Sequence, residues 1–289
     1  MEKLRKGFVI NGTYTVKTRV GAGAFGEVFR VEHKHLGSQV LKLLKAEIVN
    51  EKKFTGVINE ARILAGLSHP NVVRVFEANS FNDGEQERYY LTMEFISGES
   101  LSSLIERKSP LDLALALEIQ MDYLAGLSYA HDRSSPIVHR DINEDNIILS
   151  YSKGSTKALL ADFGLAAISD EVSWSNSSAG RYGFMAPECF FGSYLPSSDV
   201  FSAGMVLYRM LTGVYPWQYL SLTCNSYADV SNQVLASRKN VVSKPSTYNE
   251  NVSEQLDEIV MLSLEKDLSK RFRNAGEFLE ALQPFAIKN

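Results

Sequence analysis

Hydrophobic and polar residues along this chain follow two different periods. Between residues 8 and 45, β-branched and aromatic residues alternate with polar ones among scattered glycines, which predicts β-strands. From Leu113, apolar residues recur every three or four positions and predict one face of a long helix that ends near His131. Residues 197–213 are apolar on nearly every side and end at Gly213, which predicts a helix buried in the core.

The change from strand-like to helix-like sequence predicts two lobes. A sheet-rich part comes first and a helical part follows, because each pattern buries its apolar face against its own neighbours. The change falls near FISGES (95–100), which we interpret as a hinge. We expect an N-terminal lobe over about 1–94, a hinge over about 94–98 and a C-terminal lobe over about 99–289.

Composition narrows the classes of partner. The 289 residues are 45% hydrophobic and carry a formal net charge of −4, so the chain can bury a core but has no basic field for nucleic acid or anionic lipid. Cys189 and Cys224 show no metal-ligand spacing and are read as reduced thiols. The chain lacks an apolar run of roughly 18 to 20 residues, and its start, MEKLRKGF, has no signal-peptide core. We therefore expect a cytoplasmic protein with small-molecule or protein partners and no membrane partner.

A glycine-rich stretch, VGAGAFGEVF (20–29), is a candidate phosphate-binding loop. Gly21, Gly23 and Gly26 would let backbone N–H groups approach phosphate oxygens closely. A dinucleotide-binding turn requires a helix after the last glycine, whereas EVFRVEH reads as a strand. The stretch therefore predicts a hairpin lying over a nucleotide. By itself it is a weak signal, and a purely structural hairpin remains the alternative.

Further short motifs follow the glycine-rich stretch in a fixed order. They are QVLKLLK with Lys42 on a strand, INEARIL with Glu60 on a helix, HRDINEDN (139–146) after the long helix, ADFG with Asp162, and MAPE ending at Glu188.

In this order and spacing the chain resembles the eukaryotic-type (Hanks-type) Ser/Thr protein kinases over essentially its whole length. Two later features of the sequence agree with this resemblance. Asp199 opens the predicted buried helix, and KDLSKRF places Arg271 where the family pairs an arginine with the glutamate at position 188, Glu188. The resemblance implies an α+β, two-lobed protein-kinase-like fold. Its N-terminal lobe would hold an antiparallel sheet plus one helix, and its C-terminal lobe would be mainly helical.

The resemblance also implies a role for each motif in transferring the γ-phosphoryl group of ATP. Lys42, held by Glu60, would bind the α- and β-phosphates, and Asn146 and Asp162 would bind Mg²⁺. Asp141 would orient the hydroxyl of a protein substrate and accept its proton. His139 would pack against Phe163 rather than act in catalysis. The implied nucleotide-binding set is Val20, Gly21, Ala22, Gly23, Gly26, Val28, Val40, Lys42, Met93, Glu94, Ile96 and Ile148.

Two positions depart from the family pattern. Asn143 stands where Ser/Thr kinases usually have lysine, and GRYGFMAPE (180–188) puts Arg181 where they have threonine. We hypothesise that Arg181 supplies the missing positive charge to the transferring phosphoryl group or to Asp141. The alternative is that Arg181 faces solvent or favours acidic substrates.

Other readings of the function remain open at this point. Residues 143–145 match neither the Ser/Thr form nor the tyrosine form of the loop, and Ser/Thr is preferred. A pseudokinase that serves as a nucleotide-binding scaffold is one alternative, which Asn143 motivates. An aminoglycoside-type phosphotransferase is another, although it would lack the MAPE segment and its arginine partner. The oligomeric state is left open.

A serine-rich stretch, SDEVSWSNSSAG (169–180), is a candidate site of regulation. Arg140 of the HRD motif commonly receives an activation-loop phosphate in this family, and such charge-assisted pairs order a loop. We therefore expect autophosphorylation within this stretch. The alternative is a polar loop that carries no phosphate. The candidate positions are Ser173, Ser175, Ser177 and Ser178.

Overall fold

The chain divides into two compact units. The first contains the residues up to Ser68 together with Val73–Ile96, and the second contains His69–Val72 and most of the chain from Ser97 onward. The computed structural model describes residues 4–23, 26–45, 58, 61, 63–152, 154–163, 182–217 and 226–286.

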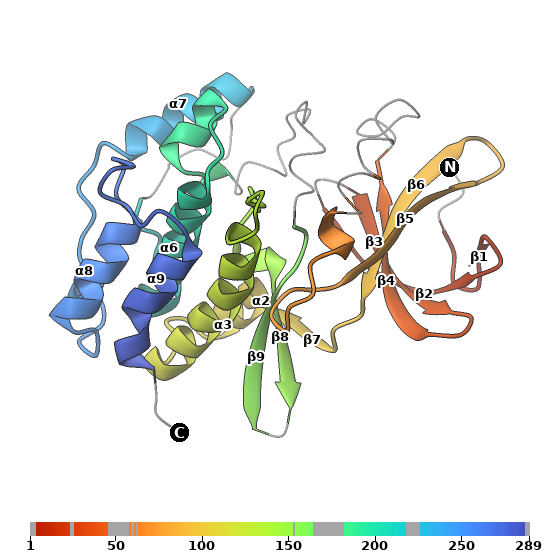
Figure 1. Ribbon diagram of the computed structural model, residues 1–289, viewed down its shortest axis with the longest axis horizontal. Helices are drawn as coiled ribbons and strands as arrows, with labels where there is room; N and C mark the ends of the chain where they lie inside the picture. The colour runs from red at the N-terminus through yellow and green to blue at the C-terminus, as the bar shows by residue number, and fades with distance from the viewer. Residues whose placement is uncertain are drawn as a thin grey trace. The chain divides into compact units, whose positions relative to one another are not determined.

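The first unit is built on a six-stranded sheet whose neighbouring strands are all antiparallel (Figure 1). The strands lie in the order β1-β2-β3-β4-β6-β5. The glycine-rich stretch joins β2 to β3, so the predicted hairpin is confirmed. The strand bounds are β1 Val9–Ile10, β2 Tyr14–Ala22, β3 Gly26–His33, β4 Gly37–Leu44, β5 Val75–Asn82 and β6 Glu87–Glu94.

Alternation along β3 and β4 separates the two faces of this sheet. Phe29 of β3 and Leu41 and Leu43 of β4 belong to one buried apolar cluster. Successive side chains of a strand point to opposite faces, so Val40 and Lys42 of β4 face away from that cluster. One face of the sheet thus holds a core, while the other carries the lysine singled out from the sequence.

The second unit combines a small sheet with a group of helices. Its sheet pairs β8 (Ile147–Ser152) with β7 (Gly98–Ser100) on one side and β9 (Ser155–Leu160) on the other. The helices are α2 Leu101–Arg107, α3 Leu113–His131, α6 Pro196–Thr212, α7 Tyr227–Ser237, α8 Glu254–Ser263 and α9 Ala275–Leu282. Short 3₁₀ helices are η1 Glu144–Asn146, η3 Pro187–Phe191, η4 Pro245–Thr247 and η5 Gln283–Phe285.

Helices α3 and α6 form the centre of the second unit. The side chain of Asp112 caps α3 by accepting the Ala114 N–H at 2.9 Å, and the helix ends at His131 as the sequence predicts. Helix α6 is buried along nearly its whole surface, packs against α3, α8 and α9 (Figure 1), and ends at Gly213, whose positive φ of 78° suits glycine. In the described part of the chain, no helix has the length and apolar character needed to cross a membrane.

These two units have the architecture that the sequence analysis predicts, an α+β fold with an antiparallel sheet unit and a mainly helical unit. The lobe limits themselves stay a prediction. The break between the units falls between Ile96 and Ser97, and the short segment His69–Val72 groups with the helical unit. It does so because Asn71 bonds to β9: its side chain donates to the Ala158 carbonyl at 2.9 Å, and its own carbonyl accepts the Leu160 N–H at 2.9 Å.

Candidate active site

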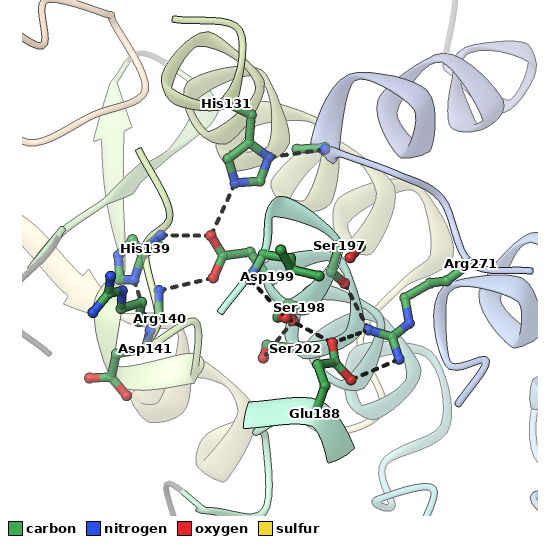
Figure 2. Close-up of polar contacts among 12 residues, drawn as sticks. His131, His139, Arg140, Asp141, Glu188, Ser197, Ser198, Asp199, Ser202 and Arg271 are labelled. Carbon is green, nitrogen blue, oxygen red and sulfur yellow. Dashed lines mark hydrogen bonds and ion pairs between the residues drawn. The ribbon is translucent and has the colours of Figure 1, made fainter. Parts of the chain in front are cut away.

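A buried aspartate fixes the loop that contains residues 139–146. Asp199 of α6 is 2% exposed. Its carboxylate accepts the backbone N–H groups of His139 at 2.6 Å and Arg140 at 2.9 Å (Figure 2). The His131 ring contacts the same carboxylate through Nε2 at 3.0 Å, while its Nδ1 accepts the Ala275 N–H at 3.2 Å. Since Nδ1 is an acceptor, Nε2 carries the proton and donates to Asp199. Asp199 thereby ties the loop to the core.

His139 has the packing role that the resemblance implies. Its ring centroid lies 4.6 Å from that of Phe163, and the histidine is fully buried. Nδ1 accepts the Asp141 N–H at 3.2 Å, which leaves Nε2 to donate to the Ala161 carbonyl at 2.8 Å. The His139 ring therefore joins the loop to the chain just before Asp162.

Two carboxamides bracket the carboxylate of Asp141. Asn146 donates through Nδ2 to Oδ2 of Asp141 at 2.9 Å and to its backbone carbonyl at 2.7 Å. Asn143 donates to the other carboxylate oxygen, Oδ1, at 3.0 Å. Asp141 itself is only partly buried. A carboxylate held at both oxygens yet still accessible is suited to accept a proton from a correctly placed hydroxyl.

Asn146 and Asp162 have the donor chemistry for Mg²⁺. The Ala161 N–H donates to the Asn146 carbonyl at 2.8 Å, which brings the residue before Asp162 against the loop. Because Asn146 uses Nδ2 on Asp141, its side-chain oxygen is the atom suited to a hard cation. Among the described residues, no group of three or more His, Cys, Asp or Glu side chains is placed to hold a metal. A Mg²⁺ ion held by these two residues would therefore take further ligands from phosphate and water.

In the sheet unit, the candidate nucleotide-binding side chains share one face. Lys42 is directly opposite Val28 of β3, and Val40 is directly opposite Met93 of β6. Directly paired residues of antiparallel strands project to the same side, and Val40 and Lys42 are two positions apart. The two valines, the methionine and the lysine thus line the sheet face opposite the apolar cluster. Lys42 is 4% exposed, so it is not a strand lysine that merely faces solvent.

The glycines of the hairpin differ in what requires them. A Cβ on Gly26 would lie 1.9 Å from the Leu43 carbonyl oxygen, so close strand packing alone demands glycine there. A Cβ on Gly21 or Gly23 would meet no atom within 4 Å, and neither residue has the positive φ that favours glycine. Packing among the described residues therefore does not explain these two glycines, whereas the approach of a phosphate group would.

The remaining nucleotide-set residues lie within strands or just after one. Val20 and Ala22 belong to β2, and Val20 is exposed. Glu94 ends β6, and its N–H donates to the Arg74 carbonyl at 2.9 Å. Ile96 and Ile148 are both partly buried; Ile96 belongs to the sheet unit and Ile148 to β8 of the helical unit.

Several predicted residues lie outside the described part of the chain. They are Glu60, Arg181, Cys224 and the four serines Ser173, Ser175, Ser177 and Ser178. Cys189 is described and buried, and burial raises the pKa of its thiol to about 12, which fits an unreactive cysteine.

The predicted pairing of Glu188 with Arg271 is confirmed. Nη1 of Arg271 lies 2.7 Å from Oε1 of Glu188 and Nη2 lies 3.3 Å from Oε2, a two-pronged contact (Figure 2). The arginine side chain is fully buried. The pair fixes the end of the MAPE segment against the start of α6, where Nη1 also donates to the Ser197 carbonyl at 3.0 Å.

Sequence reasoning did not identify Glu144, a buried acid between Asp141 and Asn146. Glu144 is 8% exposed, and in the described part of the chain its Oε1 has no hydrogen-bond partner. Oε2 accepts the Tyr215 hydroxyl at 3.4 Å. Burial raises the pKa of Glu144 to about 7, although the nearby Arg209 lowers it. No sequence signal marks this residue, because an acid in a polar loop is normally solvated.

Replacing Glu144 by glutamine is expected to change how stability depends on pH. The pKa of Glu144 is raised in the folded chain, so its stabilising contribution is complete below its unfolded pKa, roughly 4.3, and is lost as pH rises through about 7. Between about pH 5 and pH 8, wild type should therefore lose up to about 3 kcal/mol of unfolding free energy relative to Glu144→Gln. Urea unfolding of both proteins across this range measures the difference. If the unfolding free energies of the two proteins changed in parallel with pH, the raised pKa of Glu144 would be contradicted.

Comparison with known proteins gives a consistent result. A family model described as protein kinase domain matches residues 14–282. A probable serine/threonine-protein kinase of Clostridium perfringens is 30% identical over 96% of this chain and 39% of its own length. Serine/threonine-protein kinase PknJ of Mycobacterium tuberculosis is 30% identical over 96% of this chain and 46% of its own. The chain thus spans less than half the length of these two curated relatives.

Solved structures agree with the sequence relatives. The crystal structure of the PknI kinase domain of Mycobacterium tuberculosis is 25% identical and aligns with a TM-score of 0.72, covering 98% of this chain and 99% of that one.

Proposed function

We propose that this chain, which belongs to the protein kinase family, transfers the γ-phosphoryl group of ATP to serine or threonine hydroxyls of protein substrates. The observation that carries the proposal is the accessible Asp141 carboxylate, bracketed by two carboxamides in a loop fixed by buried Asp199. The names of the curated relatives support the Ser/Thr class.

Each residue has a role that its chemistry supports. Asp141 orients the substrate hydroxyl and accepts its proton as the hydroxyl oxygen bonds to the γ-phosphorus of ATP and the bond from that phosphorus to the departing ADP breaks. Lys42 binds the phosphates of ATP, and Glu60 would hold Lys42 in place. Asn146 and Asp162 would hold Mg²⁺, which supplies neutralisation of the phosphate charge when bound. Val28, Val40 and Met93 give the adenine ring an apolar surface. Arg181 remains the hypothesised extra cation or, alternatively, a contact for the substrate.

The two other readings of the sequence are less well supported. An aminoglycoside-type phosphotransferase would lack the Glu188–Arg271 pair, which is present here. A pseudokinase would be expected to lose part of the catalytic set, whereas Asp141, Asn146 and Asp162 are all retained in the chain. A cytoplasmic location, where MgATP is available, and the absence of nucleic-acid and membrane partners complete the proposal.

Incubation of purified protein with radiolabelled ATP, Mg²⁺ and a general protein acceptor tests the proposal. Phosphoamino-acid analysis of the labelled product should give phosphoserine or phosphothreonine. Equal labelling by wild type and Asp141→Ala would count against protein kinase activity, and phosphotyrosine alone would correct the hydroxyl class.

Autophosphorylation of the serine-rich stretch is expected from the chemistry of Arg140. Arg140 follows the buried His139 and is itself partly buried, and its guanidinium lies 5.0 Å from the centre of the Tyr194 ring. A phosphate on Ser173, Ser175, Ser177 or Ser178 would make charge-assisted hydrogen bonds with such a guanidinium. Intact-protein and peptide mass spectrometry after incubation with MgATP should show at least one phosphate there in wild type and none in Asp141→Ala. An unmodified stretch in an active enzyme would refute this expectation.

A further inference from the structure

Asn143, a departure from the family pattern, makes three side-chain hydrogen bonds within its loop. Both hydrogens of its amide group are used, because Nδ2 donates to Oδ1 of Asp141 and to the Asp141 backbone carbonyl, each at 3.0 Å. Its side-chain oxygen accepts the Asp145 N–H at 2.9 Å. Asn143 is 5% exposed, so these bonds are shielded from water.

The orientation of this carboxamide is set from both ends. The oxygen must face the Asp145 N–H, since an NH₂ group there would place donor against donor. The nitrogen must face Asp141, since an oxygen there would lie against a carboxylate. Only one of the two flipped positions of the amide satisfies both neighbours, and it directs N–H groups at Asp141.

Asn146 also directs an N–H group at the Asp141 carboxylate, toward its other oxygen. It donates to Oδ2, and Asn143 donates to Oδ1, so each oxygen of Asp141 has its own N–H donor. One donor constrains the orientation of the carboxylate less than two do, because the terminal torsion of aspartate is broad. Two donors on different oxygens fix the plane of the carboxylate and therefore the directions of the lone pairs that remain.

We propose that Asn143 is a positioning residue that holds the Asp141 carboxylate in the plane needed to accept the proton of a substrate hydroxyl. The inference rests on the proposed kinase function. A lysine at this position would carry a positive charge, but Asn143 brings none, and its hydrogen bonds to described residues are all made within the loop itself. The departure at position 143 is thus compatible with catalysis, because Asn143 orients the Asp141 carboxylate even though it brings no positive charge.

A second role of Asn143 must be separated from this one. Asn143 is also the N-cap of the short helix η1, through the bond from the Asp145 N–H. Aspartate and serine cap helices about as well as asparagine does. Asn143→Asp and Asn143→Ser therefore keep the cap acceptor while removing the amide donors. Aspartate adds a like charge beside Asp141, whereas serine does not.

Steady-state kinetics of these two variants test the inference. We expect kcat to fall by about 10²-fold in Asn143→Asp and by about 10-fold in Asn143→Ser, since small misplacements of a reacting group have effects of this size. The KM values for ATP and for the protein acceptor should change less than about 2-fold, and the melting temperature of Asn143→Ser should stay near that of wild type. Asp145→Asn is the matched control, because Asp145 is exposed in the same loop and its side chain bonds to Ser102 rather than to Asp141. It should retain full kcat.

The outcomes separate the inference from the proposed function. Full kcat in both Asn143 variants of an active enzyme overturns the positioning role and assigns Asn143 to capping alone. A raised ATP KM with unchanged kcat also overturns it, because the residue would then serve nucleotide binding. A wild-type protein that transfers no phosphate to any acceptor overturns the kinase function, and the inference with it.

Discussion

Replacement of Asp141 by asparagine is expected to lower kcat by about 10²- to 10⁴-fold, the usual contribution of a general base. The new side chain has the same shape but cannot accept a proton from a hydroxyl. Its NH₂ group would also face an amide nitrogen of Asn143 or Asn146, because both carboxylate oxygens of Asp141 accept N–H groups. The loop would stay in place, since Asp199 holds it through the backbone of His139 and Arg140.

Single-turnover kinetics with saturating MgATP measure this effect without interference from product release. Binding of a fluorescent ATP analogue to the same variant should remain within a few-fold of wild type, because Asp141 is not one of the residues assigned to the nucleotide. Asp145→Asn again controls for the loss of a negative charge in this loop. A value of kcat for Asp141→Asn close to that of wild type would show that another group accepts the proton.

Replacement of Arg271 by alanine is expected to lower the free energy of unfolding by about 3 to 5 kcal/mol, the cost of breaking a buried ion pair from one side. The arginine side chain is fully buried and serves Glu188 and the carbonyls of Glu265 and Ser197. Its guanidinium also lies 4.9 Å from the centre of the Phe201 ring. Alanine would leave the partly buried Glu188 carboxylate with Ser198 as its remaining hydrogen-bond donor among the described residues.

Urea unfolding of Arg271→Ala beside Arg273→Ala measures this difference. Arg273 forms an ion pair with Glu277 in which the arginine is 84% exposed, so its loss should change the unfolding free energy by at most about 1 kcal/mol. Adding Glu188→Gln to Arg271→Ala should recover part of the lost stability, because an uncompensated charge is then removed. If the two arginine variants were equally stable, the buried pair would contribute no more than a surface pair.

The elements that follow from the sequence are those whose signals are local. Helix α3 forms because its apolar residues recur at the helical period and Asp112 caps its start, and it ends at His131 as predicted. Helix α6 is buried, as its nearly continuous apolar residues predict, and it ends at Gly213, a residue typical of helix ends. The Glu188–Arg271 pair joins residues 83 positions apart and was expected only because whole motifs were matched to a family.

The contacts within residues 139–146 could not be predicted from local sequence signals. The sequence shows only that Asn143 stands where the family usually has lysine. In the structure, its side chain forms hydrogen bonds with Asp141 and Asp145. That contact depends on the path of the backbone, including a left-handed φ of 69° at Arg140, which no composition or period encodes. Glu144 likewise accepts a hydrogen bond from Tyr215, which lies 71 positions away in the chain.

The contact of Arg140 with Tyr194 has a consequence for the entropy of binding a phosphate group. A free arginine side chain loses up to about 2 kcal/mol of rotamer entropy when it is fixed in one geometry. The Tyr194 ring restricts the guanidinium of Arg140 before any phosphate is present, so part of that loss has already occurred within the folded chain. A phosphorylated serine that reaches Arg140 would meet a preorganised cation, and less of the binding free energy would be spent on fixing the arginine side chain.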